Sequence, residues 1–200
     1  MDSYFAATGD RRRQAEEGFA THRAEDNIEL VPPRERGRGH YALFFAVLKK
    51  NGKARACYDQ RRVNRSLVVP HFKMEGLPVV RSLLRRDDYM TSVDIKSAYP
   101  HIPIAPEHRQ FFRFVWRGEH YQFKAMPFGL ATAPLIWTKL MKPVLAYLRA
   151  RGVWVTAYID DLLILAASPE LARQHTALVI ETLERLGLTV NYEKSELNPE

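Results

Sequence analysis

Two adjacent aspartates are the residues of this chain best suited to a catalytic or metal-binding role. Asp160 and Asp161 stand between two strongly apolar runs, residues 153–159 and 162–166. Like charges this close repel each other, and partial burial among apolar side chains raises the cost of both charges. A bound divalent cation would relieve both costs. Because aspartate is also common in turns, an exposed polar turn is the alternative interpretation of the doublet.

A third aspartate favours the cation. Asp94 follows the apolar run 89–93, and a strand ending there beside the doublet would bring three carboxylates together. Without a cysteine or histidine partner, such a group suits hard Mg²⁺ rather than zinc. Two ions about 3.5–4 Å apart would stabilise the attacking and leaving oxygens of an in-line phosphoryl displacement. Spacing along the chain does not decide whether the strands are neighbours.

The strands that must position these carboxylates follow from the apolar pattern. Residues 153–159 and 162–166 predict two strands that flank the doublet. Residues 89–95 predict a third strand, and 188–191 a short further one. The doublet is therefore expected at the tip of a hairpin.

Helices are expected between and after these strands. Apolar residues recur at helical spacing over 75–86 and over 131–151, where Pro143 predicts a bend. Ser168-Pro169-Glu170 is typical of a helix start, and that helix is expected to run to Gly187, a typical C-cap.

Two more hairpins are expected in the first two thirds of the chain. The apolar run 41–49 is followed by Asn51-Gly52, the strongest short hairpin signal, and by the basic, alternating run 53–59. Residues 111–116 and 120–125 alternate around a turn and predict the second hairpin. The order of elements is an α+β pattern in which helices cover one sheet.

The first 40 residues read differently. Residues 1–36 are rich in charge and poor in large apolar side chains, and Pro32-Pro33 is followed by a basic stretch. We therefore expect residues 1–40 to be a charged extension or linker and residues 41–200 to be the domain.

The composition narrows the partners and the compartment. A formal net charge of +7 favours polyanionic partners such as nucleic acid without demonstrating binding. Cys57 is the single cysteine, and no Cys/His cluster has zinc spacing, which suits a reducing compartment. No apolar stretch approaches the roughly 18 residues of a membrane span, and the N-terminus has no signal-peptide pattern. We expect an intracellular chain without a membrane partner; cytoplasm and nucleus are not distinguished.

Several motifs, in order along residues 41–197, resemble those of reverse transcriptases. Tyr158-Ile159-Asp160-Asp161 resembles the Tyr-x-Asp-Asp box, and residues 92–99 resemble the family's first aspartate motif. Residues 125–134 are similar to the Met-Pro-Phe-Gly-Leu…Ala-Pro motif, and residues 187–194 to the motif that follows the box. Residues 48–55 resemble the family's fingers hairpin, and residues 59–64 resemble the segment that leaves it.

The resemblance is to the retrotransposon enzymes, in the branch with long terminal repeats or a DIRS-like tyrosine recombinase, and residues 71–75 favour the DIRS-like group. It implies the right-hand polymerase fold, with fingers at about 41–88 and 105–130 and palm at about 89–104 and 131–200. The thumb and RNase H domain are absent from these residues.

The resemblance also implies catalytic roles. Asp94 and Asp160 would hold two Mg²⁺ ions, for which Mn²⁺ is a possible substitute, and the Ile95 carbonyl would complete one coordination shell. Asp161 would be the supporting carboxylate. Lys194 matches the lysine proposed to protonate the leaving pyrophosphate; a surface lysine without a role is the alternative.

Phosphate contacts are implied at two places. Lys49 and Arg55 would grip the triphosphate from the fingers hairpin, where cations neutralise the transferring charge. A generic basic hairpin on the template backbone is the alternative, and Lys50 competes with Lys49. The backbone N–H groups of Ser97 and Ala98, at an expected helix start, suit phosphate oxygens.

Sugar and primer contacts are implied for aromatic residues. The Tyr99 ring would collide with a 2′-hydroxyl and so favour deoxynucleotides. Phe128 and Gly129 would floor the nucleotide pocket, where glycine permits close backbone approach. Tyr158 would pack beside the primer end. For all three aromatic residues, a plain core position is the alternative.

The resemblance predicts RNA-directed DNA synthesis within a retroelement polyprotein. The expected partners are an RNA or DNA template with its primer, deoxynucleoside triphosphates, and the missing thumb and RNase H segments. A non-catalytic nucleic-acid-binding remnant is the alternative. An RNA polymerase of related palm fold is a third reading, against which the Met-Pro-Phe-Gly motif and Tyr99 both argue.

Overall fold

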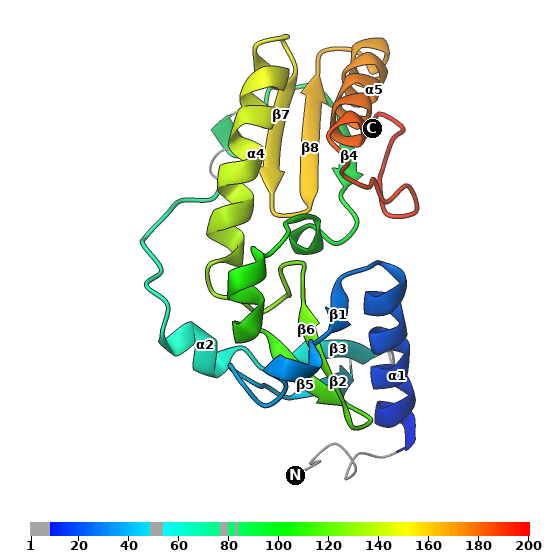
Figure 1. Ribbon diagram of the computed structural model, residues 1–200. Helices are drawn as coiled ribbons and strands as arrows, with labels where there is room; N and C mark the ends of the chain where they lie inside the picture. Colours follow the sequence, from blue (N-terminus) through cyan, green and yellow to red (C-terminus); the bar gives the residue numbers. More distant parts are fainter. Residues whose placement is uncertain (1–8, 49–53, 77–79, 83) are drawn as a thin grey trace. The chain divides into compact units, whose positions relative to one another are not determined.

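The computed structural model describes residues 9–48, 54–76, 80–82 and 84–200 (Figure 1). The chain divides into two compact units: unit 1 comprises Met1–Val69 and Tyr99–Ala133, and unit 2 comprises Pro70–Ala98 and Pro134–Glu200. Within the described residues, no helix has the length and apolar character needed to cross a bilayer.

Unit 1 contains a three-stranded antiparallel sheet and a separate hairpin. The sheet has the order β1 (Ile28–Leu30), β6 (Glu119–Phe123), β5 (Arg113–Trp116). The hairpin joins β2 (Phe44–Leu48) to β3 (Ala54–Tyr58). Both expected hairpins are therefore confirmed, although the turn at 49–53, with Lys49, lies outside the described residues.

Short helical turns connect these strands. They are the 3₁₀ helices η2 (Pro33–Glu35), η3 (Tyr99–His101) and η4 (Pro106–Phe111), and the α-helix α2 (Arg61–Arg65).

The N-terminal segment is part of unit 1. Helix α1 (Gly9–Ala24) packs on β2 and β3, and β1 pairs with β6. The Phe19 ring stacks on Trp116 with centroids 4.9 Å apart. The structure thus differs from the expected separate extension over residues 1–40. Ala15 of α1 is buried, but the charged residues around it leave no apolar stripe for the sequence to show. The three residues of β1 are too few for a strand pattern to show.

A buried arginine ties the loop after β1 to the sheet. The Arg113 side chain is 2% exposed. It donates to the Gln122 amide oxygen, to the backbone carbonyls of Glu35 and Arg38, and to the Glu35 carboxylate at 2.6 Å. These partners offset the cost of burying its charge.

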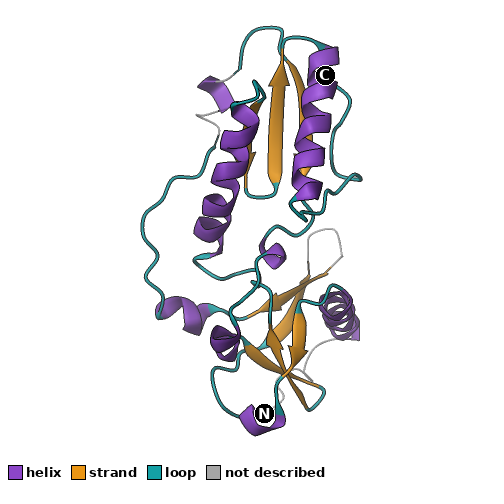
Figure 2. Ribbon diagram, turned by 45° about the horizontal axis from the view of Figure 1, so that its top comes forward, coloured by secondary structure: helices purple, strands orange, loops and turns teal. Residues whose placement is uncertain are grey.

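Unit 2 is one antiparallel sheet covered by two helices. The strand order is β4 (Tyr89–Asp94), β8 (Asp161–Ala166), β7 (Trp154–Tyr158). Helices α4 (Ala133–Arg149) and α5 (Pro169–Arg185) lie on the same face of this sheet (Figures 1 and 2). The expected palm sheet backed by helices is confirmed.

The helix ends of unit 2 follow the local signals. The Ser168 hydroxyl accepts a hydrogen bond from the Leu171 N–H, and Gly187 has φ +80°. Helix α4 runs through Pro143. Of the expected helix at 75–86, residues 80–82 are helical and 71–76 have no regular structure, whereas 77–79 and 83 lie outside the described residues. The expected strand at 188–191 is reduced to one bridge, Ile95 with Val190.

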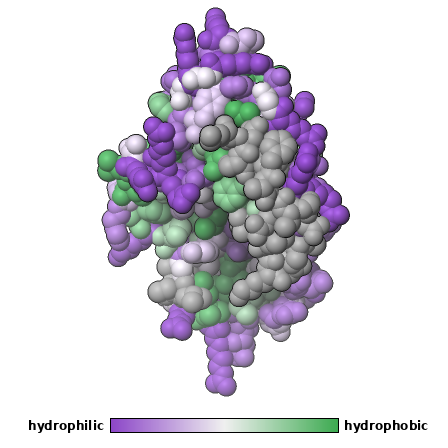
Figure 3. Space-filling model, turned by 90° about the horizontal axis from the view of Figure 1, so that it is seen from below, coloured by the Kyte–Doolittle hydropathy of each residue, from purple (hydrophilic) through white to green (hydrophobic). Residues whose placement is uncertain are grey.

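Alternation along the strands of unit 2 builds its core. Val93, Leu162 and Ile164 are fully buried. Each such side chain stabilises the fold by roughly 1.5–3 kcal/mol relative to exposure. Hydrophilic side chains, in contrast, occupy most of the outline of the face seen in Figure 3.

Candidate active site

Three aspartates meet at one end of the sheet of unit 2. Asp94, the last residue of β4, is the direct cross-strand partner of Asp161, the first residue of β8. The Ile95 N–H donates to the carbonyl oxygen of Asp160 at 2.7 Å. The sequence left open whether these strands are neighbours, and the register shows that they are.

Asp160 lies in a tight turn between β7 and β8. Tyr158 pairs with Asp161, so Ile159 and Asp160 form a two-residue hairpin loop. Ile159 has φ +54°, an unfavourable conformation for a β-branched residue. The Trp137 indole N–H of α4 donates to the Ile159 carbonyl at 2.7 Å. The sequence gives no signal for this role of Trp137, because the contact joins residues 22 positions apart.

The segment after α5 lies against Asp94. The Asn191 N–H donates to the Asp94 carbonyl at 2.8 Å, and the Asp94 N–H donates to the Ser195 hydroxyl at 3.0 Å. These bonds bring Lys194 within electrostatic reach of Asp161. The role of Ser195 has no signal in the sequence because the contact joins residues about 100 positions apart.

The charges of this group act on one another. Burial raises the pKa of Asp161 above its ordinary value, and the nearby carboxylates of Asp160 and Asp94 raise it further. The Lys194 ammonium opposes this effect. The charges of Asp160 and Asp94 therefore destabilise the charged form of Asp161.

The donor chemistry fits a hard divalent cation. The group offers carboxylate oxygens together with backbone carbonyls, which Mg²⁺ prefers. As the side chains lie, no three His, Cys, Asp or Glu residues of the described ranges are close enough to form a metal site. The repulsion at Asp161 is the cost that a cation would remove.

Two expected phosphate-binding residues follow the first aspartate in unit 2. Ser97 and Ala98 lie in a turn, and Ser97 has φ +53°. The helix start expected there is not an α-helix, since only the three-residue η3 follows. Left-handed backbone within a turn is a feature of backbone nests, the anion-binding concavities that successive N–H groups form.

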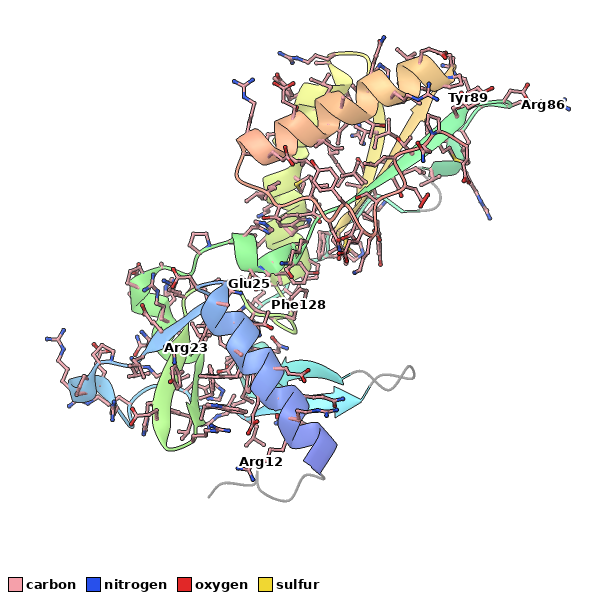
Figure 4. All side chains as sticks on the ribbon, turned by 90° about the vertical axis from the view of Figure 1, so that its right-hand side faces the viewer. Arg12, Arg23, Glu25, Arg86, Tyr89 and Phe128 are labelled. Atoms are coloured by element: carbon pink, nitrogen blue, oxygen red, sulfur yellow. The ribbon has the colours of Figure 1, made fainter. Side chains whose placement is uncertain are left out.

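The other expected nucleotide contacts lie in unit 1. Tyr99 is buried, and its ring centroid lies 5.2 Å from that of Phe128. Phe128, labelled in Figure 4, is 43% exposed, so the plain core alternative is wrong for it. Arg55 lies on β3 opposite Val47.

The Phe128-Gly129 loop is held by a residue that sequence reasoning left without a role. The Asn64 side chain donates to the Gly129 carbonyl at 2.9 Å and accepts from the Ala131 N–H at 2.8 Å. Gly129 has φ +93°, and an added Cβ would meet only ordinary contacts. Backbone conformation rather than crowding therefore requires glycine here.

Tyr158 is exposed in the described structure. Its exposed fraction is 52%, which excludes the alternative of an ordinary core tyrosine.

At the other end of the same sheet, Tyr89 is the first residue of β4, and Figure 4 shows Arg86 projecting beyond it. Arg86 therefore lies at the end of β4 opposite to the carboxylates.

Solved structures share this architecture. A foamy viral protease-reverse transcriptase in complex with double-stranded DNA matches with a TM-score of 0.82 and 18% identity. The match covers 96% of this chain and 32% of that one. The fold class is thus the polymerase right-hand fold, represented by fingers and palm.

Sequence comparison identifies the family within that class. The model described as "Reverse transcriptase (RNA-dependent DNA polymerase)" matches residues 47–199. The chain therefore belongs to the reverse transcriptase family, whose members use divalent metal ions.

Two curated relatives are polyproteins. The Gag-Pol polyprotein of Rous sarcoma virus subgroup C (strain Prague) is 31% identical over 164 residues, which are 78% of this chain and 10% of that protein. The retrovirus-related Pol polyprotein from transposon gypsy of Drosophila melanogaster is 27% identical over 145 residues, or 72% of this chain and 14% of that protein. The chain spans about a tenth of the length of the first of these relatives.

Proposed function

We propose that this chain carries the catalytic core of an RNA-directed DNA polymerase that adds deoxynucleotides to a primer 3′-hydroxyl. The observation that carries the proposal is the pairing of Asp94 with Asp161 beside the turn that holds Asp160. Three acidic side chains at one sheet end are a costly arrangement that metal-dependent phosphoryl transfer uses.

Asp94 and Asp160 would hold two Mg²⁺ or Mn²⁺ ions, with Asp161 as the supporting carboxylate and the Ile95 carbonyl as a further ligand. When bound, such ions supply electrostatic stabilisation of the attacking and leaving oxygens. Lys194 would carry a proton to the leaving pyrophosphate. Its effect on the pKa of Asp161 supports a place at this site.

Nucleotide selection is assigned to residues that the family motifs single out. Lys49 and Arg55 would neutralise the triphosphate, and the N–H groups of Ser97 and Ala98 would bind phosphate oxygens. Tyr99 would exclude a 2′-hydroxyl, and its ring contact with Phe128 supports a rigid surface for that purpose. Gly129 would let the backbone approach the nucleotide.

Tyr158 would pack beside the primer end, which its exposure supports. The proposed partners are an RNA or DNA template with its primer and deoxynucleoside triphosphates. The solved foamy viral relative was in complex with double-stranded DNA, and the net charge of +7 suits such a partner. Thumb and RNase H segments of a retroelement polyprotein would complete the enzyme.

Primer extension tests the proposal. The chain, alone and within a longer polypeptide that includes the downstream segments, is supplied with an RNA template, a DNA primer and Mg²⁺. The expected result is deoxynucleotide incorporation that Asp160→Asn abolishes. Equal incorporation by Asp160→Asn would contradict the metal role, and template binding without any extension would favour a non-catalytic binding remnant.

A further inference from the structure

Glu75 closes the open edge of the sheet of unit 2. Strand β7 is at the edge of the order β4-β8-β7. The Glu75 carboxylate accepts from the Thr156 hydroxyl at 2.8 Å and from the Ala157 N–H at 3.3 Å. A side chain from a segment without regular structure therefore takes the place of a neighbouring strand at this point.

Arg149, at the end of α4, completes the contact. Its guanidinium donates to both Glu75 carboxylate oxygens, at 2.8 and 2.7 Å, and to the Val155 carbonyl at 2.7 and 3.0 Å. The pair thus satisfies an acceptor and a donor of the same edge strand. We call Glu75, Arg149 and Thr156 the β7 clasp.

The Glu75 carboxylate is charged at neutral pH. Burial by itself would raise its pKa. Hydrogen bonds from Arg149, Thr156 and the Ala157 N–H, together with the charge of Arg149, outweigh burial, and the net pKa lies below its ordinary value. Charge-assisted hydrogen bonds of this kind are stronger and more directional than neutral ones.

The same helix holds the other end of β7. The Trp137 indole bonds the Ile159 carbonyl, twelve residues before Arg149 on α4. Between these two contacts lies a cavity of about 390 Å³, whose lining includes Met141, Leu145 and Ala157. Strand β7 is therefore fastened to α4 on both sides of a space rather than by continuous packing there.

We propose that Glu75 and Arg149 are positioning residues, which fix β7 so that Tyr158 and Asp160 stay in place for nucleotide addition. The inference rests on the proposed polymerase function. Ala157 precedes Asp160 by three residues, or roughly 10 Å of extended chain. The unfavourable conformation of Ile159 acts to displace the turn that holds Asp160. The clasp opposes that displacement.

The test compares Glu75→Gln with Glu181→Gln. Glu181 pairs with Arg185 on the exposed face of α5, so its substitution makes the same chemical change away from β7. Thr156→Val is a second variant, which removes one hydrogen bond and keeps the shape. Three quantities are measured: amide hydrogen exchange along β7, the half-saturating Mn²⁺ concentration, and kcat and KM for single-nucleotide addition.

Glu75→Gln is expected to speed exchange at Ala157 and to weaken Mn²⁺ binding. We expect kcat to fall on the order of 10- to 100-fold, since a misplacement of about 1 Å can cost that much. KM for the primer–template should stay within about twofold of the original, because phosphate contacts elsewhere dominate its affinity. Thr156→Val should lie between Glu75→Gln and the unchanged Glu181→Gln.

Unchanged Mn²⁺ binding and kcat in Glu75→Gln would overturn the proposal. So would an even rise in exchange across all of unit 2, because that pattern marks general destabilisation. If the unsubstituted protein binds Mn²⁺ but extends no primer, the polymerase function fails, and Mn²⁺ binding and exchange in Glu75→Gln still decide the role of the clasp.

Discussion

Unit 1 and unit 2 each hold a group of charged side chains in place, and they do so in opposite ways. In unit 1, Arg113 is buried with hydrogen-bond partners that match its donors. In unit 2, Asp94 and Asp160 lie beside Asp161, and their charges raise the cost of ionising it. A buried charge with hydrogen-bond partners is compatible with a stable fold. Carboxylates that repel one another are unfavourable until a bound cation offsets their charge, which is typical of a functional site.

Removing one charge from the three aspartates of unit 2 is expected to have the largest effect on activity without lowering the free energy of unfolding. Asp94→Asn is expected to lower nucleotide incorporation on the order of 10³-fold, because a metal ligand is lost. Its free energy of unfolding without metal should not fall, because repulsion on Asp161 is reduced. Primer extension and urea unfolding in EDTA measure the two effects, and a large loss of stability would contradict the comparison.

Arg113→Ala should show the opposite behaviour in unit 1. We expect the free energy of unfolding to fall by about 3 kcal/mol, because the buried Gln122 side chain and the backbone carbonyls of Glu35 and Arg38 lose a charged hydrogen-bond donor. Urea unfolding measures the loss. Arg185→Ala, on an exposed ion pair, is the control and should change stability by less than about 1 kcal/mol. Equal losses for both variants would contradict the stabilising role of the buried Arg113 hydrogen bonds.

The contact from α4 to the active-site turn should have an intermediate effect. Trp137→Phe keeps an aromatic side chain, although a smaller one, and leaves the Ile159 carbonyl without its donor, which costs about 1–2 kcal/mol. Since Ile159 is strained, we expect incorporation to fall about tenfold, with a smaller change in the midpoint of thermal unfolding. Single-nucleotide kinetics measure this, and Trp154→Phe on β7 is the matched control.

The repulsion at Asp161 should be visible in the pH dependence of stability. A carboxyl group whose pKa is raised in the folded state binds its proton more tightly there than in the unfolded chain. Without metal, its contribution is therefore favourable below its ordinary pKa and is lost as pH rises through the raised value. Asp161→Asn should remove that fall, and saturating Mn²⁺ should reduce it. Urea unfolding across this acidic range tests both, and parallel profiles for the two proteins would contradict the repulsion.

The smallest expected effect tests whether the stability of unit 2 can fall while nucleotide incorporation at the active site stays unchanged. Ser168→Ala removes the N-cap of α5 and should cost about 1 kcal/mol of unfolding free energy. Incorporation below the unfolding temperature should stay unchanged. Denaturation and primer extension on the same sample provide the check, and a fall in incorporation would couple α5 to the turn.

Local patterns predicted most elements of the fold. The hairpins, the strands beside Asp160, and the cap at Ser168 depend on neighbouring residues, so periodicity and turn chemistry were sufficient. The N-terminal segment was read differently, because the apolar side chains of α1 are spread among charged ones. Its burial depends on strands that come later in the chain.

Within the site, the residue types and motifs in the sequence determined the three carboxylates, the aromatic candidates and the family resemblance, which the family match confirms. Only the tertiary structure decided that Asp94 faces Asp161, that Trp137 holds the turn, and that Glu75 and Arg149 close the edge of β7. The physical reason is one of range. Periodicity and capping are interactions over a few residues, whereas strand register and side-chain contacts across tens of residues are selected by packing of the whole unit.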